Sequence, residues 1–172
     1  MATALLISKR DLIRNTIIDG SVDVEKYLHF IRLAQEIHLQ NILGTKLLRK
    51  IQDDIVAGTL AGDYKDLVDN YLKDILIHYA MTDYIPFVSY SITNGGIQKH
   101  QGENAEIPEK VEVDALIDKH REFAQFFTRR FIDFINNNSS KFPEYLNNNQ
   151  EDMFPSQNAD LLGGYYDRSF WK

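Results

Sequence analysis

The sequence contains no cysteine among its 172 residues. This absence excludes disulfide bonds, thiolate metal sites and cysteine nucleophiles together. Stability must therefore come from packing, and 44% of the residues are hydrophobic. A chain of this length usually forms one domain and can bury about 70% of its unfolded surface. We expect a single globular core.

Positively charged residues are fewer than negatively charged ones: the chain has 19 Lys and Arg residues and 25 Asp and Glu residues, for a net charge of −6. Tight binding to nucleic acid needs clustered cations that neutralise phosphates, so this function class is disfavoured. Long hydrophobic runs are missing too. The apolar patch in "MATALLISKRDLI" is too short to span a membrane and is in the wrong order for a signal peptide. The prediction is a soluble protein made in a cytoplasm.

Familiar catalytic and cofactor motifs are also lacking. Neither Glu-x-x-His nor His-Glu-x-x-His occurs, and Gly44–Lys46 lacks the earlier glycine of a phosphate loop, because residue 39 is leucine. His38 and His120 lie on or beside apolar stripes, where hydrogen-bonded core histidines are common. We therefore predict no catalytic residues, no metal ligands and no cofactor, and a protein that is not an enzyme.

Helical periodicity dominates the first 136 residues. "SKRD" at Ser8–Asp11 resembles a capping box, and Gly44, Gly58 and Pro86 are expected to interrupt or end helices. The pattern predicts an all-α bundle with about four principal helices, placed at residues 22–42, 45–57, 63–86 and 113–135. The third of these has the widest apolar face and is expected to be central.

Two apolar stripes define the predicted contacts of this bundle. The second helix carries its stripe on Val24, Leu28, Ile31, Gln35 and His38, and the last helix on Leu116, His120, Phe123, Phe127, Phe131 and Phe134. We expect the four phenylalanines to anchor the last helix in the core.

The stretch "SITNGGIQKH", residues 91–100, separates the last two long helices. Its Asn-Gly step and adjacent glycines suit a turn or hairpin and cannot propagate a helix. Two interpretations remain open: a slack connector, or a segment that the protein presents to a partner.

From Asn136 onward the composition changes to asparagine triplets, Phe-Pro steps and a glycine pair. This predicts a helical domain at residues 1–136 and an extended C-terminal tail at residues 137–172. The tail is rich in apolar side chains that could dock on a partner, namely Phe142, Tyr145, Leu146, Phe154, Leu161, Leu162, Tyr165, Tyr166, Phe170 and Trp171. The alternative is that these side chains fold back onto their own domain.

The order of these segments resembles the head-to-tail connector proteins of tailed bacteriophages, particularly the ring proteins of crAss-like phages of Bacteroides-like hosts. The resemblance covers residues 5–136 and is carried by "LLISKRDLI", "AQEIHLQNILGTKLL", "YKDLVDNYLKDILIHYAMTDYIPFVSYSITNGGI" and the late Phe-rich helix. It implies a virion protein at the head-to-tail junction that forms a ring, commonly of twelve subunits, under the portal. DNA would pass through this ring without specific binding.

In such rings the segment between the last two long helices projects towards a neighbour or the next ring. The resemblance thus implies an interface at Thr93, Asn94, Gly95, Gly96 and Ile97. Two other classes stay open: a helical adaptor or regulatory module that binds a cellular protein, and a small helical enzyme. A connector is expected to form a closed ring or to join a portal, whereas the alternatives are expected to be monomers or dimers.

Overall fold

The computed structural model describes residues 4–19, 21–23, 25–88, 90–93, 96–99, 109–147 and 152–157. The helices are α1 (Lys9–Asn15), α2 (Glu25–Ala34), α3 (Gln40–Ala57), α4 (Gly62–Leu67), α5 (Lys73–Tyr84), α6 (Lys110–Asn138) and α7 (Pro143–Leu146). Two π-helical turns, η1 (Gln35–Leu39) and η2 (Val68–Leu72), join α2 to α3 and α4 to α5; two 3₁₀ turns are η3 (Ile85–Phe87) and η4 (Ser139–Lys141). The predicted all-α bundle is confirmed.

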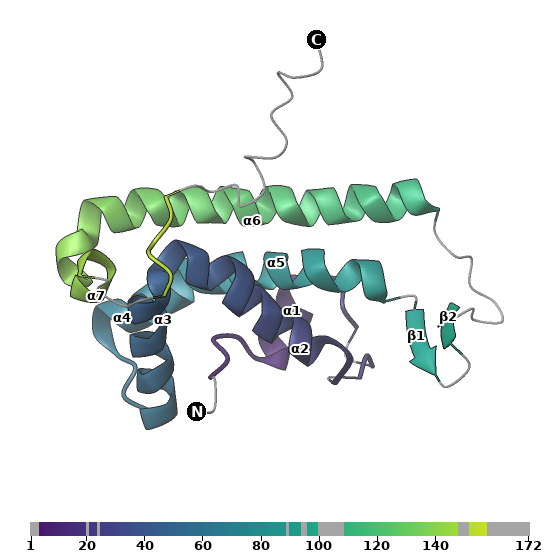
Figure 1. The fold of residues 1–172 in the computed structure, drawn as a ribbon, viewed down its shortest axis with the longest axis horizontal. Coiled ribbons are helices and arrows are strands. Elements are labelled where there is room, and N and C mark those ends of the chain that lie inside the picture. The colour runs from purple at the N-terminus through teal and green to yellow at the C-terminus, as the bar shows by residue number, and fades with distance from the viewer. Residues whose placement is uncertain are drawn as a thin grey trace, which may run out of the picture.

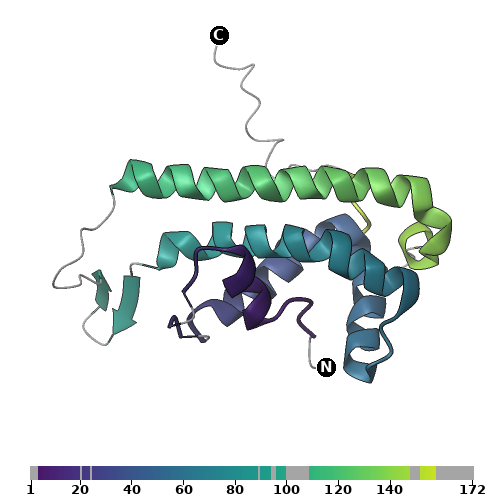
Figure 2. The same cartoon turned by 180° about the vertical axis from the view of Figure 1, so that it is seen from behind.

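Helix α5 is the central helix, as its wide apolar face predicted. It contacts α1, α2 and α6, and its residues Ile75, Leu76 and Ile77 are buried. Helix α6 lies alongside it in both views, and α1 covers the face of α5 seen from behind (Figures 1 and 2). Helices α3, α4 and α7 gather at one end of the molecule, and the strands β1 (Tyr90–Thr93) and β2 (Gly96–Lys99) lie at the other.

Local backbone chemistry explains most of the helix boundaries. Ser8 and Asp11 form the predicted capping box at the start of α1. Helix α3 ends where Gly58 takes the left-handed φ of 68°, which costs glycine little. Pro86 lies in η3 directly after α5, because its ring and its missing N–H prevent the helix from continuing.

Gly44 interrupts the helical path of α3. Its φ of 74° and ψ of 158° are non-helical, so the helix bends there although hydrogen bonding resumes on both sides. A side chain would be strained in this conformation, which explains why glycine occupies the position. The predicted interruption of the helix at Gly44 is thus confirmed.

Two of the predicted stripes need correction at their edges. Leu28 of α2 and Phe123 of α6 are exposed, whereas Tyr27, Phe30, Ile31 and Ala34 form the buried face of α2. Of the four phenylalanines expected in the core, only Phe131 is fully buried, while Phe127 and Phe134 pack partly buried against it. Helical spacing identified the correct side of each helix, but the centre of each predicted stripe lies to one side of the centre of the buried face.

The predicted domain boundary at residue 136 is also corrected. It falls inside α6, which runs on to Asn138 and leads through η4 into α7. Helix α7 packs against α3, and the side chain of Lys141 forms an ion pair with Asp63 at 3.0 Å. The helical domain therefore includes residues 137–146.

Candidate functional site

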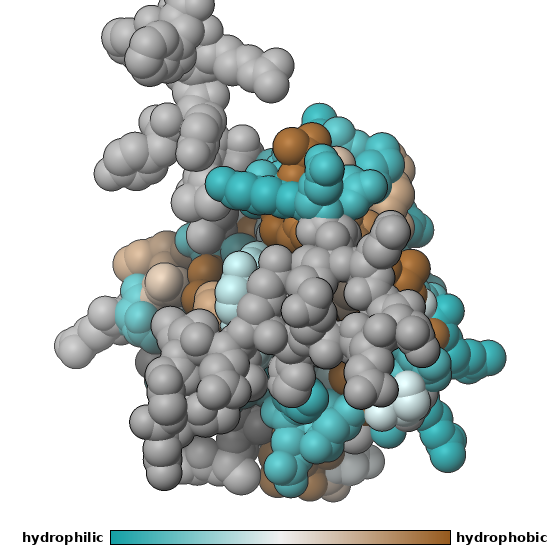
Figure 3. All heavy atoms as spheres, turned by 90° about the vertical axis from the view of Figure 1, so that its right-hand side faces the viewer, coloured by the Kyte–Doolittle hydropathy of each residue, from teal (hydrophilic) through white to brown (hydrophobic). Residues whose placement is uncertain are grey.

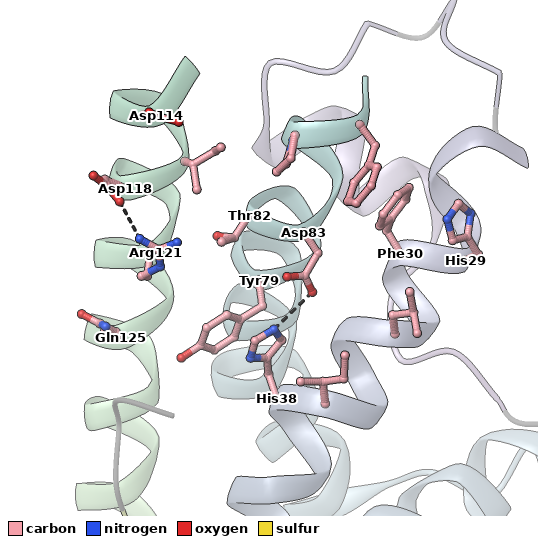
Figure 4. A pocket seen from close by; sticks show the side chains of 15 residues that line it. His29, Phe30, His38, Tyr79, Thr82, Asp83, Asp114, Asp118, Arg121 and Gln125 are labelled. Carbon is pink, nitrogen blue, oxygen red and sulfur yellow. Dashed lines mark hydrogen bonds and ion pairs between the residues drawn. The ribbon is translucent and has the colours of Figure 1, made fainter. Parts of the chain in front are cut away.

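A cleft of about 800 Å³ opens between α2, α5 and α6. Figure 4 shows its three walls: α6 on one side, α2 on the other and α5 as the floor between them. The α2–η1 side contributes Phe30, Leu33 and Ile37, and α6 contributes Ile117, Asp118, Arg121 and Gln125. The floor is formed by Tyr79, Thr82 and Asp83 of α5, followed by Pro86 and Phe87 of η3. Its size is within the range of pockets that hold ligands or peptide side chains.

A histidine and an aspartate meet on the floor of this cleft. His38 Nε2 lies 3.1 Å from Asp83 Oδ2, and the His38 ring stacks on Tyr79 with centroids 4.0 Å apart. The other ring nitrogen, Nδ1, is buried and has no hydrogen-bond partner among the described residues. The carboxylate fixes the ring in place, which agrees with the expectation that His38 is a hydrogen-bonded histidine.

The π-helical turn η1 helps to shape this floor. It comprises Gln35–Leu39, directly after α2, and so includes both Ile37 and His38. A π turn inserts one extra residue into the helical ladder and changes which side chains face the neighbouring helix. Two residues of η1 therefore contact different parts of the molecule. Gln35 is buried and forms hydrogen bonds with the backbone of Ala4 and Leu6, while Ile37 is exposed in the cleft wall.

A second pair of polar residues is enclosed between α5 and α6. His78 Nδ1 and His120 Nδ1 lie 3.1 Å apart, so one ring must donate and the other accept. Phe123 and Phe127 lie within 6 Å of the His78 ring, at centroid distances of 5.2 and 5.7 Å. Burial, together with the neighbouring His120, lowers the pKa of His78 to about 4, and burial also lowers the pKa of His120. Both rings are neutral at physiological pH.

The segment expected to project forms an antiparallel hairpin, one of the two forms predicted for it. Strand β1 pairs with β2 in the register Ile92 to Ile97 and Thr93 to Gly96. Asn94 and Gly95, the remaining residues of the predicted interface, lie outside the described residues. The hairpin lies at the end of the molecule beyond α5 (Figure 1).

Exposed apolar side chains precede this hairpin. Phe87, Val88 and Tyr90 are each more than half exposed, although the Phe87 ring also packs at a tilt against Phe30, with centroids 5.4 Å apart. Figure 3 shows apolar residues at the surface of this end, among hydrophilic ones. Single exposed apolar residues are ordinary, but several in succession are typical of contact surfaces. We call Phe87, Val88 and Tyr90 the hairpin base.

The proposed docking anchors of the tail divide into three groups. Phe142 and Tyr145 are buried in the core of their own domain, so their assignment as anchors for a partner is wrong. Leu146 and Phe154 are exposed. The others, Leu161, Leu162, Tyr165, Tyr166, Phe170 and Trp171, lie outside the described residues.

Residues 152–157 lie against the bend in α3 at Gly44. The Thr45 N–H donates to the Met153 carbonyl at 3.0 Å, and the Ser156 N–H donates to the Asn41 carbonyl at 2.8 Å. Asp152 Oδ2 accepts hydrogen bonds from Gln40 and Thr45, each at 2.9 Å. This part of the tail therefore supplies backbone partners to a helix whose own ladder is interrupted.

The described ranges contain neither a metal-binding cluster nor a membrane-spanning helix. Within them, no group of three or more His, Asp or Glu side chains is arranged to hold a metal ion. Likewise, no helix in this part of the chain is long and apolar enough to cross a membrane.

The sequence did not reveal the cleft, because its walls come from three elements that are far apart in the chain. One signal was present: Leu33 and Ile37 lie off the buried stripe of α2 yet are aliphatic, which suggests a second apolar face. The His78–His120 contact left no such signal, because the two residues are 42 positions apart.

The fold and the cleft define a helical domain with a partly apolar groove and a hairpin at one end. The chain belongs to a family of unknown function, DUF6712, whose model matches residues 39–155. This match includes the bend at Gly44, the hairpin and residues 152–155 of the tail segment that contacts the bend. No curated protein and no solved structure matches the chain.

Proposed function

We propose that this protein is the repeating subunit of a head-to-tail connector ring in a tailed bacteriophage. The ring would lie between the portal and the tail, extend the DNA channel and provide the platform to which the tail attaches. The proposal begins from the resemblance of residues 5–136 to connector proteins. The family match neither names nor opposes this role, because the family has no known function.

The observation that carries the proposal is the position of the hairpin and its base. A β-hairpin interrupts an otherwise helical chain at the end of the molecule, and Phe87, Val88 and Tyr90 before it are exposed. A subunit that joins a ring needs a surface for its neighbour, and the hairpin base offers an apolar one at the end of the molecule.

The partners follow from the same proposal. They are further copies of the chain in a ring, for which twelve is the common number, the portal protein above it and tail or ring proteins below it. DNA is a passing ligand: the net charge of −6 supports a channel through which the duplex slides without being gripped. The proposed location is the virion, after synthesis in the bacterial cytoplasm.

A helical adaptor that binds a cellular protein is the second candidate, and the cleft is the observation that favours it. An adaptor would bind its partner through the cleft as a monomer or dimer, whereas a connector would bind copies of itself through the hairpin base. The two functions therefore differ in oligomeric state and, apart from the shared residue Phe87, in the surface that mutations disrupt.

The test is electron microscopy and native mass spectrometry of the chain, alone and mixed with the portal protein from the same genome. We expect closed rings, or a ring bound to the portal. A chain that stays monomeric or dimeric in every mixture would refute the connector function.

A matched pair of variants makes this test specific. Val88→Lys places a charge at the hairpin base, and Val56→Lys places the same charge at the end of α3, at the opposite end of the molecule. Val88 is 52% exposed and Val56 is 68% exposed, so both variants should fold. We expect Val88→Lys alone to abolish ring formation. Equal assembly of both variants would show that the hairpin base is not the interface.

A further inference from the structure

We propose that the cleft between α2, α5 and α6 binds the C-terminal segment of the same chain, residues 158–172. The occupant is thus a stated segment whose sequence is "NADLLGGYYDRSFWK". This inference does not rest on the connector function, since it concerns a contact within one subunit.

The cleft and the segment have matching chemistry. Leu33, Ile37, Ile117 and Phe87 give the cleft apolar walls, and its volume is about 800 Å³. The segment carries Leu161, Leu162, Tyr165, Tyr166, Phe170 and Trp171 among its 15 residues. Aromatic side chains bury large areas and are the usual anchors in grooves of this size.

The described part of the tail ends near one end of the cleft, on the elements that continue two of its walls. Ser156 donates its N–H to the carbonyl of Asn41, which lies three residues after the cleft residue His38. Gln157 Nε2 then donates to Asn136 Oδ1 of α6 at 3.0 Å. The described chain therefore ends on the continuation of the α6 wall, 11 residues beyond Gln125, which is about 16 Å along that helix from the His38 end of the cleft.

The remaining length is sufficient to cover the cleft. Fifteen residues reach roughly 50 Å when extended. Along the α2 wall, the cleft extends from His38 to His29, which corresponds to about 14 Å at the helical rise. The segment can therefore enter near His38, pass Leu33 and reach the far end with residues left for turns.

Charge favours one direction for the segment. The far end of the cleft is bordered by Asp114 and Asp118 near the start of α6, with Asp118 already paired to Arg121. The last residues of the segment include Asp167, Arg168 and Lys172, so cationic side chains outnumber acidic ones there by two to one. A chain that enters at His38 brings these two cations to the acidic end, where Asp114 has no ion-pair partner among the described residues.

The sequence offers a built-in reporter, because Trp171 is the single tryptophan. We expect acrylamide to quench Trp171 fluorescence several-fold less in the full chain than in a free peptide of residues 158–172. We also expect Leu33→Glu to raise quenching towards the peptide value. Leu28→Glu is the matched control: Leu28 and Leu33 are both on α2, are 42% and 41% exposed, and only Leu33 lines the cleft.

Two outcomes of the fluorescence test would overturn the proposal. The first is quenching of the full chain that equals that of the peptide. The second is an equal response to the two glutamate substitutions, which would show that Trp171 is shielded somewhere other than the cleft. Circular dichroism of both variants verifies that each remains folded.

Disulfide trapping decides whether the segment belongs to the same subunit. The chain has no native cysteine, so a Leu33→Cys, Phe170→Cys double variant has one possible pairing within a monomer. We expect oxidation to give a cross-linked species of monomer mass, and much less with Leu28→Cys, Phe170→Cys. A product of dimer mass or larger would overturn binding within one chain and assign the segment to a neighbouring copy. That result would leave the ring proposal standing.

Discussion

Phe142 provides the sharpest test of where the helical domain ends. Its side chain is 0% exposed and packs edge-on against Tyr64 and Phe134, with ring centroids 5.4 and 6.2 Å away. Emptying such a site with Phe142→Ala costs about 3 to 5 kcal/mol. For a domain of this size, each kcal/mol lowers Tm by about 2 to 4 °C, so we expect a fall of roughly 6 to 20 °C.

The assay is urea unfolding followed by circular dichroism, with Leu146→Ala as the control. Leu146 is four residues further on but 60% exposed, so its truncation should change stability by about 0.5 kcal/mol or less. A loss below about 1 kcal/mol for Phe142→Ala would refute the assignment of Phe142 to the core and restore it as an anchor for a partner. By the same reasoning, truncation after Ser140 is expected to destabilise the helical body.

Two further predictions concern buried polar groups. The pKa of His78 is about 4 in the fold, below the ordinary value of 6.5, so on acidification the unfolded chain takes up the proton first. The contribution of His78 to the free energy of unfolding is therefore fully present above about pH 6.5 and is lost as the pH falls towards 4. The largest loss of unfolding free energy from this protonation is about 3 kcal/mol, and the partial exposure of His78 reduces it to about 1 to 2 kcal/mol. Thermal melts at a series of pH values should therefore show a flatter pH dependence for His78→Leu than for the unmodified chain. Identical pH profiles would contradict this. Gln35 accepts from the Leu6 N–H at 3.0 Å, so Gln35→Leu should cost about 1 to 3 kcal/mol and raise hydrogen exchange at Leu6. Unchanged exchange would show that water replaces the contact.

Local signals predicted the helix boundaries because the chemistry that ends a helix lies within a few residues. Ser8 with Asp11, Gly58 and Pro86 act on neighbouring backbone groups, so their effect is readable without the fold. The asparagines at 136–138 misled the prediction. Asn137 and Asn138 stay helical, and their side chains donate to the carbonyls of Asp133 and Phe134.

Burial at the edges of a helical face depends on where the neighbouring helices lie, and no local pattern contains that information. Phe123 and Phe127 have equivalent positions on the stripe, yet Phe123 is exposed and Phe127 packs against the core. The cleft is subject to the same limit, since α2 and α6 become its walls only through their separate contacts with α5. Pro143 was the missed signal for α7, because proline favours the first turn of a helix.

The bend at Gly44 takes two backbone groups of α3 away from each other's reach as helical partners. In a straight helix, the Thr45 N–H would donate to the Asn41 carbonyl four residues earlier. Here the same two groups bind Met153 and Ser156 instead. The Thr45 N–H can donate to only one carbonyl, so a straight α3 would have to give up its hydrogen bond to Met153. A partner that drew residues 152–156 away would leave the Thr45 N–H without its acceptor unless α3 straightened, and this would couple the tail to the angle between the two halves of α3.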